Sequence, residues 1–362
     1  MPSSRRSTAP RRRLTVLRVI VVAELVVALL TGAGVVFAYQ HVDRQITAGP
    51  PIQHHVTRPK APLPTSETNI LLMGTDSRSC TGCGIDNQSG EGGSDTTILL
   101  HIADGRRSAY GISIPRDTLV DRPACHNGDH DVPAATDVIW NQAYALGGPE
   151  CTVEQVEAVT GVYIDSYITV NFGGFKDMVN AINGVEVCLP QPVDDSVAHI
   201  HFDAGTQVLD GDRALQYVRE RHSTANSDLG RMKRQQAFIA SMINKVMSAN
   251  TLTRPDRLFR FASSLAGSLQ ASPDLASAGK LVKLAASLRH ADLSHIKFVT
   301  APTTDFPRDD PNWGRLQFTP DVQALWAKVQ DDEPLGKLGK GAVTAKNPHG
   351  GKGTAAENGL CA

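Results

Sequence analysis

The sequence predicts an α/β fold over residues 68–330, in which strands are sandwiched between helices. The chain has 362 residues and a hydrophobic content of 41%, enough to bury one sizeable core with flanking segments. Within residues 68–330, short apolar runs alternate with segments of helical periodicity, and no internal repeat is evident. These observations favour one large domain.

The predicted strands are short apolar or alternating runs that end at Gly, Asp or Pro. The first three follow one another closely, so we expect them to form the centre of the sheet. A turn at Asn183-Gly184 leads into the fifth strand. The six ranges are 69–73, 97–102, 109–114, 164–170, 184–189 and 295–300.

Eight segments have the residue spacing of helices. The second begins at Thr152, a favourable N-cap, and ends before Gly161. The fifth carries an apolar stripe typical of core packing, and the sixth and seventh are rich in Leu and Ala. Helices of that composition can line an apolar tunnel, although ordinary core packing is the stronger interpretation. The eight ranges are 137–146, 152–160, 172–182, 210–219, 228–247, 254–269, 275–288 and 321–329.

The N-terminus combines a basic stretch with an apolar run. Residues 1–18 contain six arginines and no acidic residue, and residues 19–39 are predominantly apolar around Glu24. At about 1.5 Å per residue, this run can cross a hydrocarbon core of roughly 30 Å. The positive-inside rule then places residues 1–18 in the cytoplasm and the domain outside the cell. We therefore expect a single-pass transmembrane anchor in the plasma membrane; a cleaved signal peptide, the alternative, usually has a shorter apolar run.

Two further segments flank the predicted domain. Residues 40–67 are rich in proline and are expected to form an extended spacer outside the cytoplasm. Residues 331–362 consist mainly of Gly, Lys, Ala and Asn, so we expect a disordered tail.

Six cysteines agree with a location outside the cytoplasm, where disulfides persist. Cys80 and Cys83 are spaced like half of a zinc site, but no second CxxC or HxxxH follows. We therefore favour one or two disulfides and leave their connectivity open.

Two aspartates mark the ends of neighbouring predicted strands. Asp95 comes just before strand 97–102, and Asp117 follows strand 109–114. If the two strands are adjacent, their carboxylates meet, and such hard oxygen ligands suit Mg²⁺, or Mn²⁺ in its place. In the alternative interpretation, Asp95 is a cap and Asp117 a turn former.

A set of arginines forms the second group of candidate site residues. Arg219 and Arg221 point to the same side if their segment is extended, and Arg231 and Gln235 share one face of a helix. Because guanidinium groups bind phosphate oxygens in pairs and stay charged, converging arginines suit a pyrophosphate. The alternative is a set of surface charges paired with acidic neighbours, each worth little.

Several common chemistries lack their sequence marks. The chain contains no G-x-S-x-G, H-E-x-x-H or GxxxxGK[ST] string, and its histidines do not cluster. The formal net charge is −1, and the N-terminal basic stretch is short and has no helix-turn-helix pattern. We therefore expect no nucleic-acid partner.

Seven short strings, in this order, resemble the LytR-CpsA-Psr family. The resemblance covers about residues 69–246, and the strings follow a basic N-terminus and one apolar run. The strings are NILLMGTDSR (69–78), SDT (94–96), SIPRDT (113–118), N-x-A-Y-x-x-G-G (141–148), NGVEV (183–187), G-x-x-A-L-x-Y-V-R-x-R (211–221) and D-x-G-R-x-x-R-Q-Q (228–236).

The resemblance implies an α/β/α sandwich around a mixed central sheet, with an apolar tunnel for a polyprenyl chain and arginines at its mouth. It implies that Asp95 and Asp117 are catalytic carboxylates associated with Mg²⁺. It also implies that Arg219 and Arg221 take part in catalysis as well as in binding the pyrophosphate. The full set of implied substrate-binding residues is Arg116, Arg219, Arg221, Asp228, Arg231, Gln235 and Arg78.

The implied activity is that of a phosphotransferase in cell wall assembly. It moves an anionic glycopolymer, such as a teichoic acid, a capsule or an arabinogalactan-like chain, from a polyprenyl pyrophosphate to a sugar hydroxyl of peptidoglycan. Two alternatives stay open: a pyrophosphatase that hydrolyses polyprenyl diphosphates, and a non-catalytic, membrane-anchored regulator of the envelope.

Overall fold

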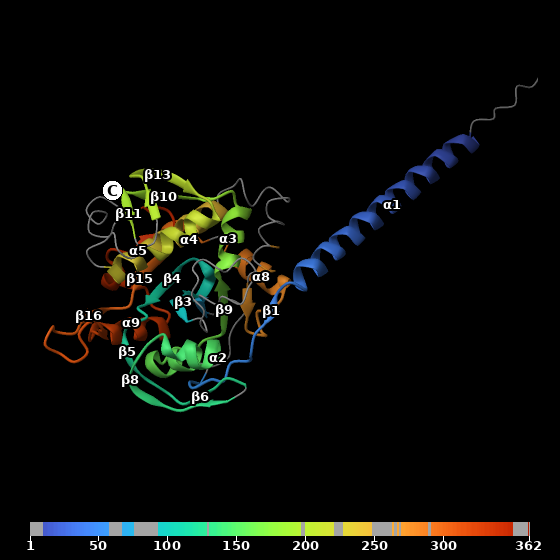
Figure 1. Cartoon of the computed structure of the whole chain (residues 1–362). Helices are drawn as coiled ribbons and strands as arrows, with labels where there is room; N and C mark the ends of the chain where they lie inside the picture. Colours follow the sequence, from blue (N-terminus) through green and yellow to red (C-terminus); the bar gives the residue numbers. More distant parts are fainter. Residues whose placement is uncertain are drawn as a thin grey trace, which may run out of the picture.

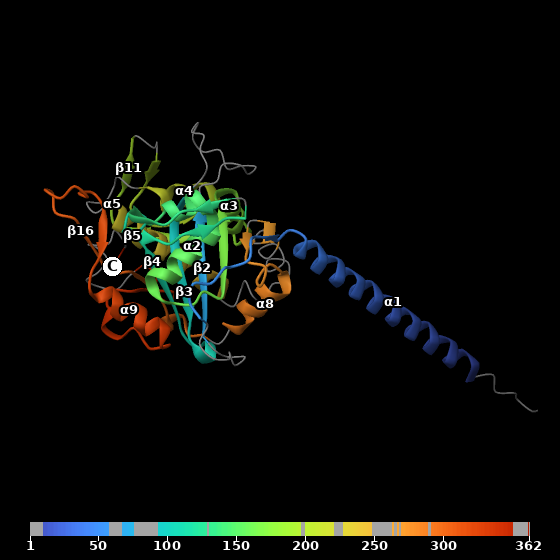
Figure 2. The ribbon, with the colours of Figure 1, turned by 90° about the horizontal axis from the view of Figure 1, so that it is seen from below.

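Helices lie on both sides of a central sheet, and a long N-terminal helix projects away from this body (Figures 1 and 2). The computed structural model describes residues 10–57, 67–75, 93–128, 130–196, 200–220, 227–247, 263, 266–267, 269–288, 291–349 and 361.

The core of the domain is a mixed sheet of eight strands. In spatial order they are β1 (Thr47–Ala48), β14 (Leu269–Ala271), β9 (Ser166–Asn171), β2 (Thr68–Thr75), β3 (Ser94–Ile102), β4 (Ala109–Ile114), β15 (Ile296–Thr300) and β18 (Val343–Thr344). β2 pairs in parallel with β9, and β4 with β15, whereas β3 runs antiparallel to both β2 and β4. Five of the six predicted strands lie in this sheet, with the first three at its centre as expected.

Both faces of the sheet are covered by helices, because successive side chains of a strand point to opposite faces. The helices are α2 (Gln142–Thr160) and α9 (Asp321–Gln330) on one face, and α3 (Phe172–Ala181), α4 (Gly211–Arg219), α5 (Ser227–Met247) and α8 (Ala278–Ser287) on the other. Leu71 and Leu99 are buried against α2 and α9, while their neighbours Leu72 and Ile98 face the other helices. This alternation confirms the predicted α/β class.

Five two-stranded ribbons extend from this body. They pair β5 (Leu119–Arg122) with β8 (Ala135–Ile139), β6 (Cys125–His126) with β7 (Asp131–Val132), β10 (Val185–Leu189) with β13 (Gly205–Leu209), β11 (Val193–Asp195) with β12 (Ile200–Phe202), and β16 (Thr303–Asp305) with β17 (Leu316–Phe318). Three short 3-10 helices complete the fold as described: η1 (Asp104–Arg106), η2 (Leu293–His295) and η3 (Gly336–Gly339).

The helix predicted over 137–146 is wrong in its first part. Residues 135–139 form β8, which pairs with β5, and α2 starts only at Gln142. α2 then continues through the predicted gap before Thr152, with a kink at Gly148, whose φ of 64° suits a residue without a Cβ. Its predicted end is confirmed, because Gly161 adopts the left-handed conformation and its N–H bonds the carbonyl of Glu157.

The tail predicted to be disordered is ordered over residues 331–349. Leu335 and Val343 are buried, and Val343 pairs with Phe298 at the edge of the sheet. Asp332 accepts a hydrogen bond from the buried His101 at 2.9 Å. The prediction of disorder for these residues is wrong, because a few apolar side chains docked on the core, such as Leu335 and Val343, are enough to order a polar segment. Residues 350–360 and 362 lie outside the described residues.

The predicted spacer also packs on the domain where it is described. Thr47 and Ala48 add a parallel strand beside β14. Farther along, the backbone N–H of His55 donates to Glu157 of α2 at 2.7 Å, and the His55 ring bonds Glu154 at 2.9 Å. These contacts fasten residues 47–56 to the body, while residues 58–66 lie outside the described residues.

The first helix, α1 (Pro10–Asp43), is longer than the apolar run of residues 19–39. Several of its large apolar side chains, among them Leu29 and Phe37, are exposed. Within the described part of the chain, no helix has both the length and the apolar character required of a membrane span. The membrane anchor therefore stays a prediction.

The two Leu- and Ala-rich helices have different outcomes. The segment predicted as a helix over 275–288 contains α8. The predicted helix 254–269 lies mostly outside the described residues, and its last residue, Leu269, belongs to β14.

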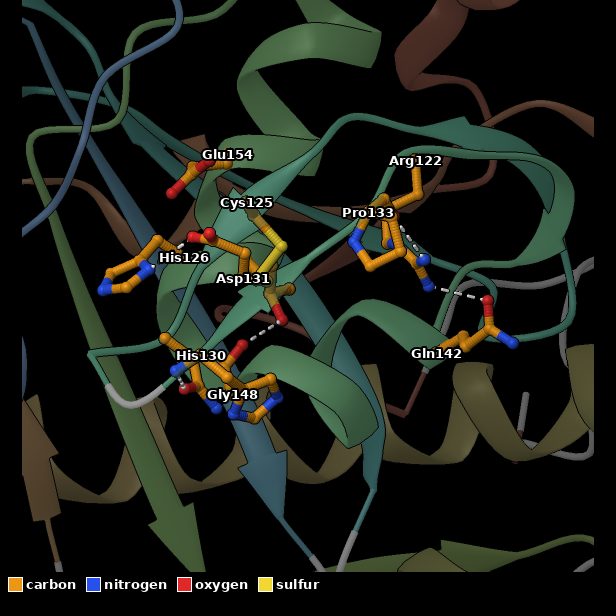
Figure 3. Close-up of a disulfide and its surroundings, with 12 residues drawn as sticks. Arg122, Cys125, His126, His130, Asp131, Pro133, Gln142, Gly148 and Glu154 are labelled. Atoms are coloured by element: carbon orange, nitrogen blue, oxygen red, sulfur yellow. Dashed lines mark hydrogen bonds and ion pairs between the residues drawn. A yellow bond between two sulfur atoms is a disulfide. The ribbon is translucent and has the colours of Figure 1, made fainter.

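Two disulfides confirm the prediction from the cysteine content. Cys125 in β6 is bonded to Cys151 in α2, and Cys188 in β10 is bonded to Cys361 near the C-terminus. Figure 3 shows the first disulfide beside Arg122, which donates hydrogen bonds to Gln142 and to the carbonyl of Pro133. The Cys125–Cys151 disulfide and the hydrogen bonds of Arg122 together fix the β5–β8 ribbon to α2. This ribbon directly follows the segment that carries Asp117. The other two cysteines, Cys80 and Cys83, lie outside the described residues.

Candidate active site

An apolar cavity of about 230 Å³ lies between the central sheet and α3, α4 and α5. Its floor comes from β2, β3 and β9, and its walls come from the three helices. The apolar lining residues are Leu72, Met73, Ile98, Val170, Phe172, Phe175, Met178, Leu215, Val218, Phe238, Ile239 and Met242. The side chains that α5 contributes, Phe238, Ile239 and Met242, belong to the apolar stripe that was predicted to serve core packing.

The cavity adjoins a smaller polar pocket. Asp95, Thr96, Arg231 and Gln235 line both spaces, and Arg219 also reaches the cavity. Arg116 lines the polar pocket. The apolar cavity therefore has a charged mouth, formed where it adjoins the polar pocket. Five of the predicted site residues line one or both of these spaces.

Arg116 brings the two predicted carboxylates together. Its guanidinium bonds Asp95 and contacts Asp117 at 3.3 Å, and all three side chains are between a fifth and a quarter exposed. The sheet explains this contact: β3 and β4 are antiparallel, with Thr97 opposite Ile114, so the start of one strand lies beside the end of the other. The prediction from strand ends is confirmed.

Asp117 has a second basic partner, which the sequence analysis missed. Arg315, at the start of β17, contacts Asp117 at 3.2 Å. The two residues are 198 positions apart, and Arg315 belongs to none of the seven strings. No local signal identified it, because only the tertiary fold places this ribbon beside the end of β4.

Arg231 and Gln235 lie one helical turn apart on α5, as predicted. Arg231 is buried, with only 2% of its surface exposed. Gln235 accepts a hydrogen bond from the Thr96 hydroxyl at 3.2 Å and donates one to the carbonyl of Val218 at 3.1 Å. Gln235 thus connects α5 to β3 and α4 at the mouth of the cavity.

Arg219 ends α4, and its guanidinium lies over the ring of Phe172, 4.7 Å from the ring centre. Behind it, Tyr217 packs against Phe202 and Phe238. Burial raises the pKa of Tyr217 to about 12, so the phenol is neutral and supports α4 by packing. Arg219 is therefore held beside the cavity by its contact with Phe172 and by the packed helix that carries it.

Arg234 has a structural role instead. It forms an ion pair of 2.8 Å with Glu220, and both side chains are at most 3% exposed. For this arginine the alternative interpretation, a charge paired with an acidic neighbour, is confirmed, although the pair is buried and not on the surface.

Three predicted site residues cannot be placed by their side chains. Arg78 and Arg221 lie outside the described residues. Asp228 belongs to the first turn of α5, but its side chain is outside the description.

The carboxylate pair fits a divalent cation by the chemistry of its donors. Asp95 and Asp117 supply hard oxygen atoms that share one guanidinium beside the polar pocket. Mg²⁺ commonly binds through one or two carboxylates and completes its shell with water and substrate phosphate. Within the described residues no group of three or more His, Cys, Asp or Glu side chains is arranged to hold a metal.

Known proteins share both the sequence and the fold. Residues 40–329 match the LytR_cpsA_psr family. The cell wall biosynthesis protein LcpA of Corynebacterium glutamicum is 30% identical over 295 residues, covering 73% of this chain and 55% of LcpA. The polyisoprenyl-teichoic acid–peptidoglycan teichoic acid transferase TagV of Bacillus subtilis is 32% identical over 200 residues, 54% of this chain and 48% of TagV. The chain thus spans about half the length of the curated relatives it matches.

Solved structures agree. The crystal structure of Bacillus subtilis TagV has a TM-score of 0.58 and 26% identity, and the match covers 75% of this chain and 98% of that one. A structure of TagT bound to LI-WTA, with a TM-score of 0.57 and 22% identity over 79% of this chain and 98% of that one, shares the fold. With the family strings, the mixed sheet and the charged mouth of an apolar cavity in one molecule, the chain belongs to the LytR-CpsA-Psr family.

Proposed function

We propose that this protein is a phosphotransferase that attaches a polyprenyl-pyrophosphate-linked anionic glycopolymer to a sugar hydroxyl of peptidoglycan. The observation that carries the proposal is the apolar cavity that adjoins a mouth of arginines and carboxylates. The transferase names of relatives such as TagV support the same class of reaction.

The cavity suits the lipid part of the donor. Its lining is almost wholly apolar, from Leu72 on the sheet to Met242 on α5, so an isoprenoid chain would lose its contact with water there. The floor of sheet and the wall of helices give a space that is largely preformed, as is usual for ligand sites.

The mouth suits the pyrophosphate. Arg219 and Arg231 reach the cavity, and Arg116 lies in the adjoining polar pocket. Guanidinium groups bind phosphate oxygens through two parallel hydrogen bonds and keep their charge at any physiological pH. Their positions would hold the two phosphates at the end of the lipid chain.

In the proposed reaction, the oxygen of the acceptor hydroxyl forms a bond to the phosphorus that carries the glycan. The bond from that phosphorus to the bridging oxygen breaks, polyprenyl monophosphate leaves, and the hydroxyl proton passes to solvent. Charge that develops on the phosphoryl oxygens is stabilised by Arg116, Arg219 and Arg231, which are already in place before the reaction.

Asp95 and Asp117 would hold Mg²⁺, or Mn²⁺ in its place, with Arg116 keeping the two carboxylates together. When bound, the cation supplies positive charge to the phosphate oxygens. Removal of divalent cations with EDTA is therefore expected to reduce transfer, and added Mg²⁺ to restore it.

The proposed location is the plasma membrane, with the domain outside the cell. The basic residues 1–18 and the exposed apolar side chains of α1, such as Leu29 and Leu30, support this arrangement. Fractionation of cells that produce the full chain tests it: recovery in a wash with high salt, without detergent, would count against an anchor.

The first test of the function compares two arginines of α4. Arg219 lines the cavity above Phe172, whereas Arg213 lies over Phe202 at 5.0 Å and does not line it. With a lipid-pyrophosphate glycan and peptidoglycan as substrates, Arg219→Ala is expected to lower transfer by about a hundredfold, the usual effect of losing one charge-stabilising group. Arg213→Ala should retain transfer within about threefold. Equal activity of the two variants would refute the role of Arg219, and free glycan as the main product would indicate the pyrophosphatase instead.

The second comparison concerns the cavity wall. Met242 lines the cavity, whereas Met247, five residues further along α5, packs elsewhere. Met242→Trp is expected to fill part of the space and to raise the KM for a long-chain polyprenyl donor about tenfold, with less effect on a short-chain donor. Met247→Trp provides the control for a large residue on the same helix. An unchanged KM in a folded Met242→Trp protein would exclude the cavity as the lipid site.

A further inference from the structure

The β16–β17 ribbon is fixed at its base to the candidate active site. The backbone N–H of Leu316 donates to the carbonyl of Asp117 at 3.2 Å, and Leu316 also forms a bridge with Thr118. At the end of β17, Phe318 packs edge-on against the buried rings of Trp140 and Trp326. The base of the ribbon is therefore part of the core, while its loop, residues 306–315, projects from the body (Figure 1).

This loop presents an exposed tryptophan. Trp313 is 62% exposed, whereas Trp140 and Trp326, the other two tryptophans of the chain, are at most 1% exposed. The loop is ordered by its own hydrogen bonds: the N–H of Trp313 donates to the carbonyl of Asp310 at 3.0 Å, and the N–H of Arg315 to that of Asn312 at 2.9 Å. The indole is thus held in water by a structured loop.

A chain of ionic contacts gives the position of this loop relative to the lipid cavity. Asp95 lines the cavity, Arg116 connects Asp95 to Asp117, and Arg315 connects Asp117 to the ribbon. The cavity and the loop that carries Trp313 are therefore connected through this charged group, the cavity at Asp95 and the loop at Arg315. In a phosphoryl transfer the attacking and leaving oxygens are roughly in line, on opposite sides of the phosphorus. If the leaving polyprenyl phosphate occupies the cavity, the attacking hydroxyl approaches from the side away from the cavity, and the loop is bonded to the part of the charged group that does not line the cavity.

We propose that the loop 306–315 is the acceptor site, and that Trp313 binds a sugar ring of a peptidoglycan glycan strand. This inference rests on the proposed function and identifies where its second substrate binds. The apolar face of an indole packs against the C–H face of a pyranose ring, and a large rigid side chain does so with little loss of conformational entropy. Asn312 and Asp310, beside Trp313 in the loop, offer polar groups for the sugar hydroxyls.

Single exposed apolar side chains are common and often have no function. Val208 on β13 is an example in this protein, with 59% of its surface exposed. What distinguishes Trp313 is that its loop is bonded, through Leu316 and Arg315, to the segment that carries Asp117. Val208 therefore serves as the matched control for exposure without that connection.

The first experiment measures binding of the acceptor without any donor. Trp313 is the one tryptophan of the three that is open to solvent, so acrylamide quenching of the intrinsic fluorescence of the full chain reports mainly on it. A soluble oligosaccharide of alternating N-acetylglucosamine and N-acetylmuramic acid is expected to reduce quenching at least twofold at saturation. Trp313→Phe should lose this protection, because the remaining indoles are already shielded.

The second experiment measures transfer to the same oligosaccharide. Trp313→Ala is expected to raise the KM for the acceptor about tenfold, the effect of removing one aromatic contact, and to change the KM for the lipid donor less than twofold. Trp313→Tyr should restore the acceptor KM to within about threefold, and Val208→Ala should leave both constants unchanged.

The inference requires both results. Quenching that the oligosaccharide does not alter, or an unchanged acceptor KM in Trp313→Ala, would overturn it. The binding experiment also separates this inference from the proposed function, because it uses no donor. Protection of Trp313 in a wild-type protein that transfers no glycan would leave the sugar site standing and refute the transferase.

Discussion

Two groups of charges near the cavity use arginine in different ways. Arg234 and Glu220 are at most 3% exposed and connect α5 to the end of α4. Arg116, Asp95 and Asp117 are a fifth to a quarter exposed and lie beside a polar pocket. The first group is enclosed by protein, so its two charges are stabilised by their ion pair. The second is open on one side, so its charges can still act on a substrate.

The difference shows that access to a pocket, and not residue type or burial, separates the charges available to a substrate from those that support the fold, since Arg231 is as buried as Arg234 but lines the cavity. A buried ion pair tolerates no loss of one partner, because the remaining charge has neither water nor a counter-charge. A partly exposed group loses little stability when it is changed, because water replaces the partner. Two variants test this distinction, and a third tests the effect of burying a carboxylate; they follow in order of decreasing effect.

The largest effect is expected from Arg234→Ala. Removal of the arginine takes the 2.8 Å ion pair from the buried Glu220, so the free energy of unfolding should fall by about 3–5 kcal/mol. Denaturant unfolding followed by circular dichroism measures the change. The double variant Arg234→Met with Glu220→Leu serves as the control, since it removes both charges of the pair and should recover much of the loss. A decrease of under 1 kcal/mol in Arg234→Ala would show that the pair is dispensable.

Arg116→Ala should have the opposite profile. We expect transfer to fall about a hundredfold, equivalent to about 2.7 kcal/mol, because the substrate loses a positive charge and the two carboxylates lose the group that holds them together. The free energy of unfolding should change by less than about 1 kcal/mol. Measurements of transfer and of denaturant unfolding on the same Arg116→Ala protein test whether activity falls without a loss of stability. If activity and stability fall together, as for Arg234→Ala, the comparison fails.

The smallest effect concerns Glu150, a buried carboxylate on α2. Burial, with a contribution from Glu154, raises its pKa, so the folded protein binds this proton more readily than the unfolded chain. Stability is therefore lost as the pH rises from the ordinary pKa of a glutamate through the raised one. Glu150→Gln should stabilise the protein at about pH 7.5 and have little effect at about pH 4. The exposed Glu186→Gln is the control. A stabilisation of Glu150→Gln that does not depend on pH would exclude this cause.

Much of the fold was predictable, because its strands are short, apolar and bounded by turn residues. The central strands β2, β3 and β4 were predicted with nearly correct bounds. The meeting of Asp95 and Asp117 was also predictable, since residues at the ends of adjacent antiparallel strands must lie together. Segments whose structure depends on distant partners were not predicted well. β8 was assigned to a helix because its pairing with β5 has no local signal, and residues 331–349 were assigned to a disordered tail although they dock on the sheet.

The sequence by itself determined the chemistry available to this protein: the carboxylates, the arginines and the apolar segments, in the order typical of the family. Only the tertiary structure decided which of them act together. Arg231 and Arg234 lie three residues apart on one helix, yet Arg231 lines the cavity and Arg234 pairs with Glu220. Arg315 reaches Asp117 from 198 residues away. The physical reason is that side-chain burial and ion pairing depend on the neighbours that folding supplies, and these neighbours come from distant parts of the chain.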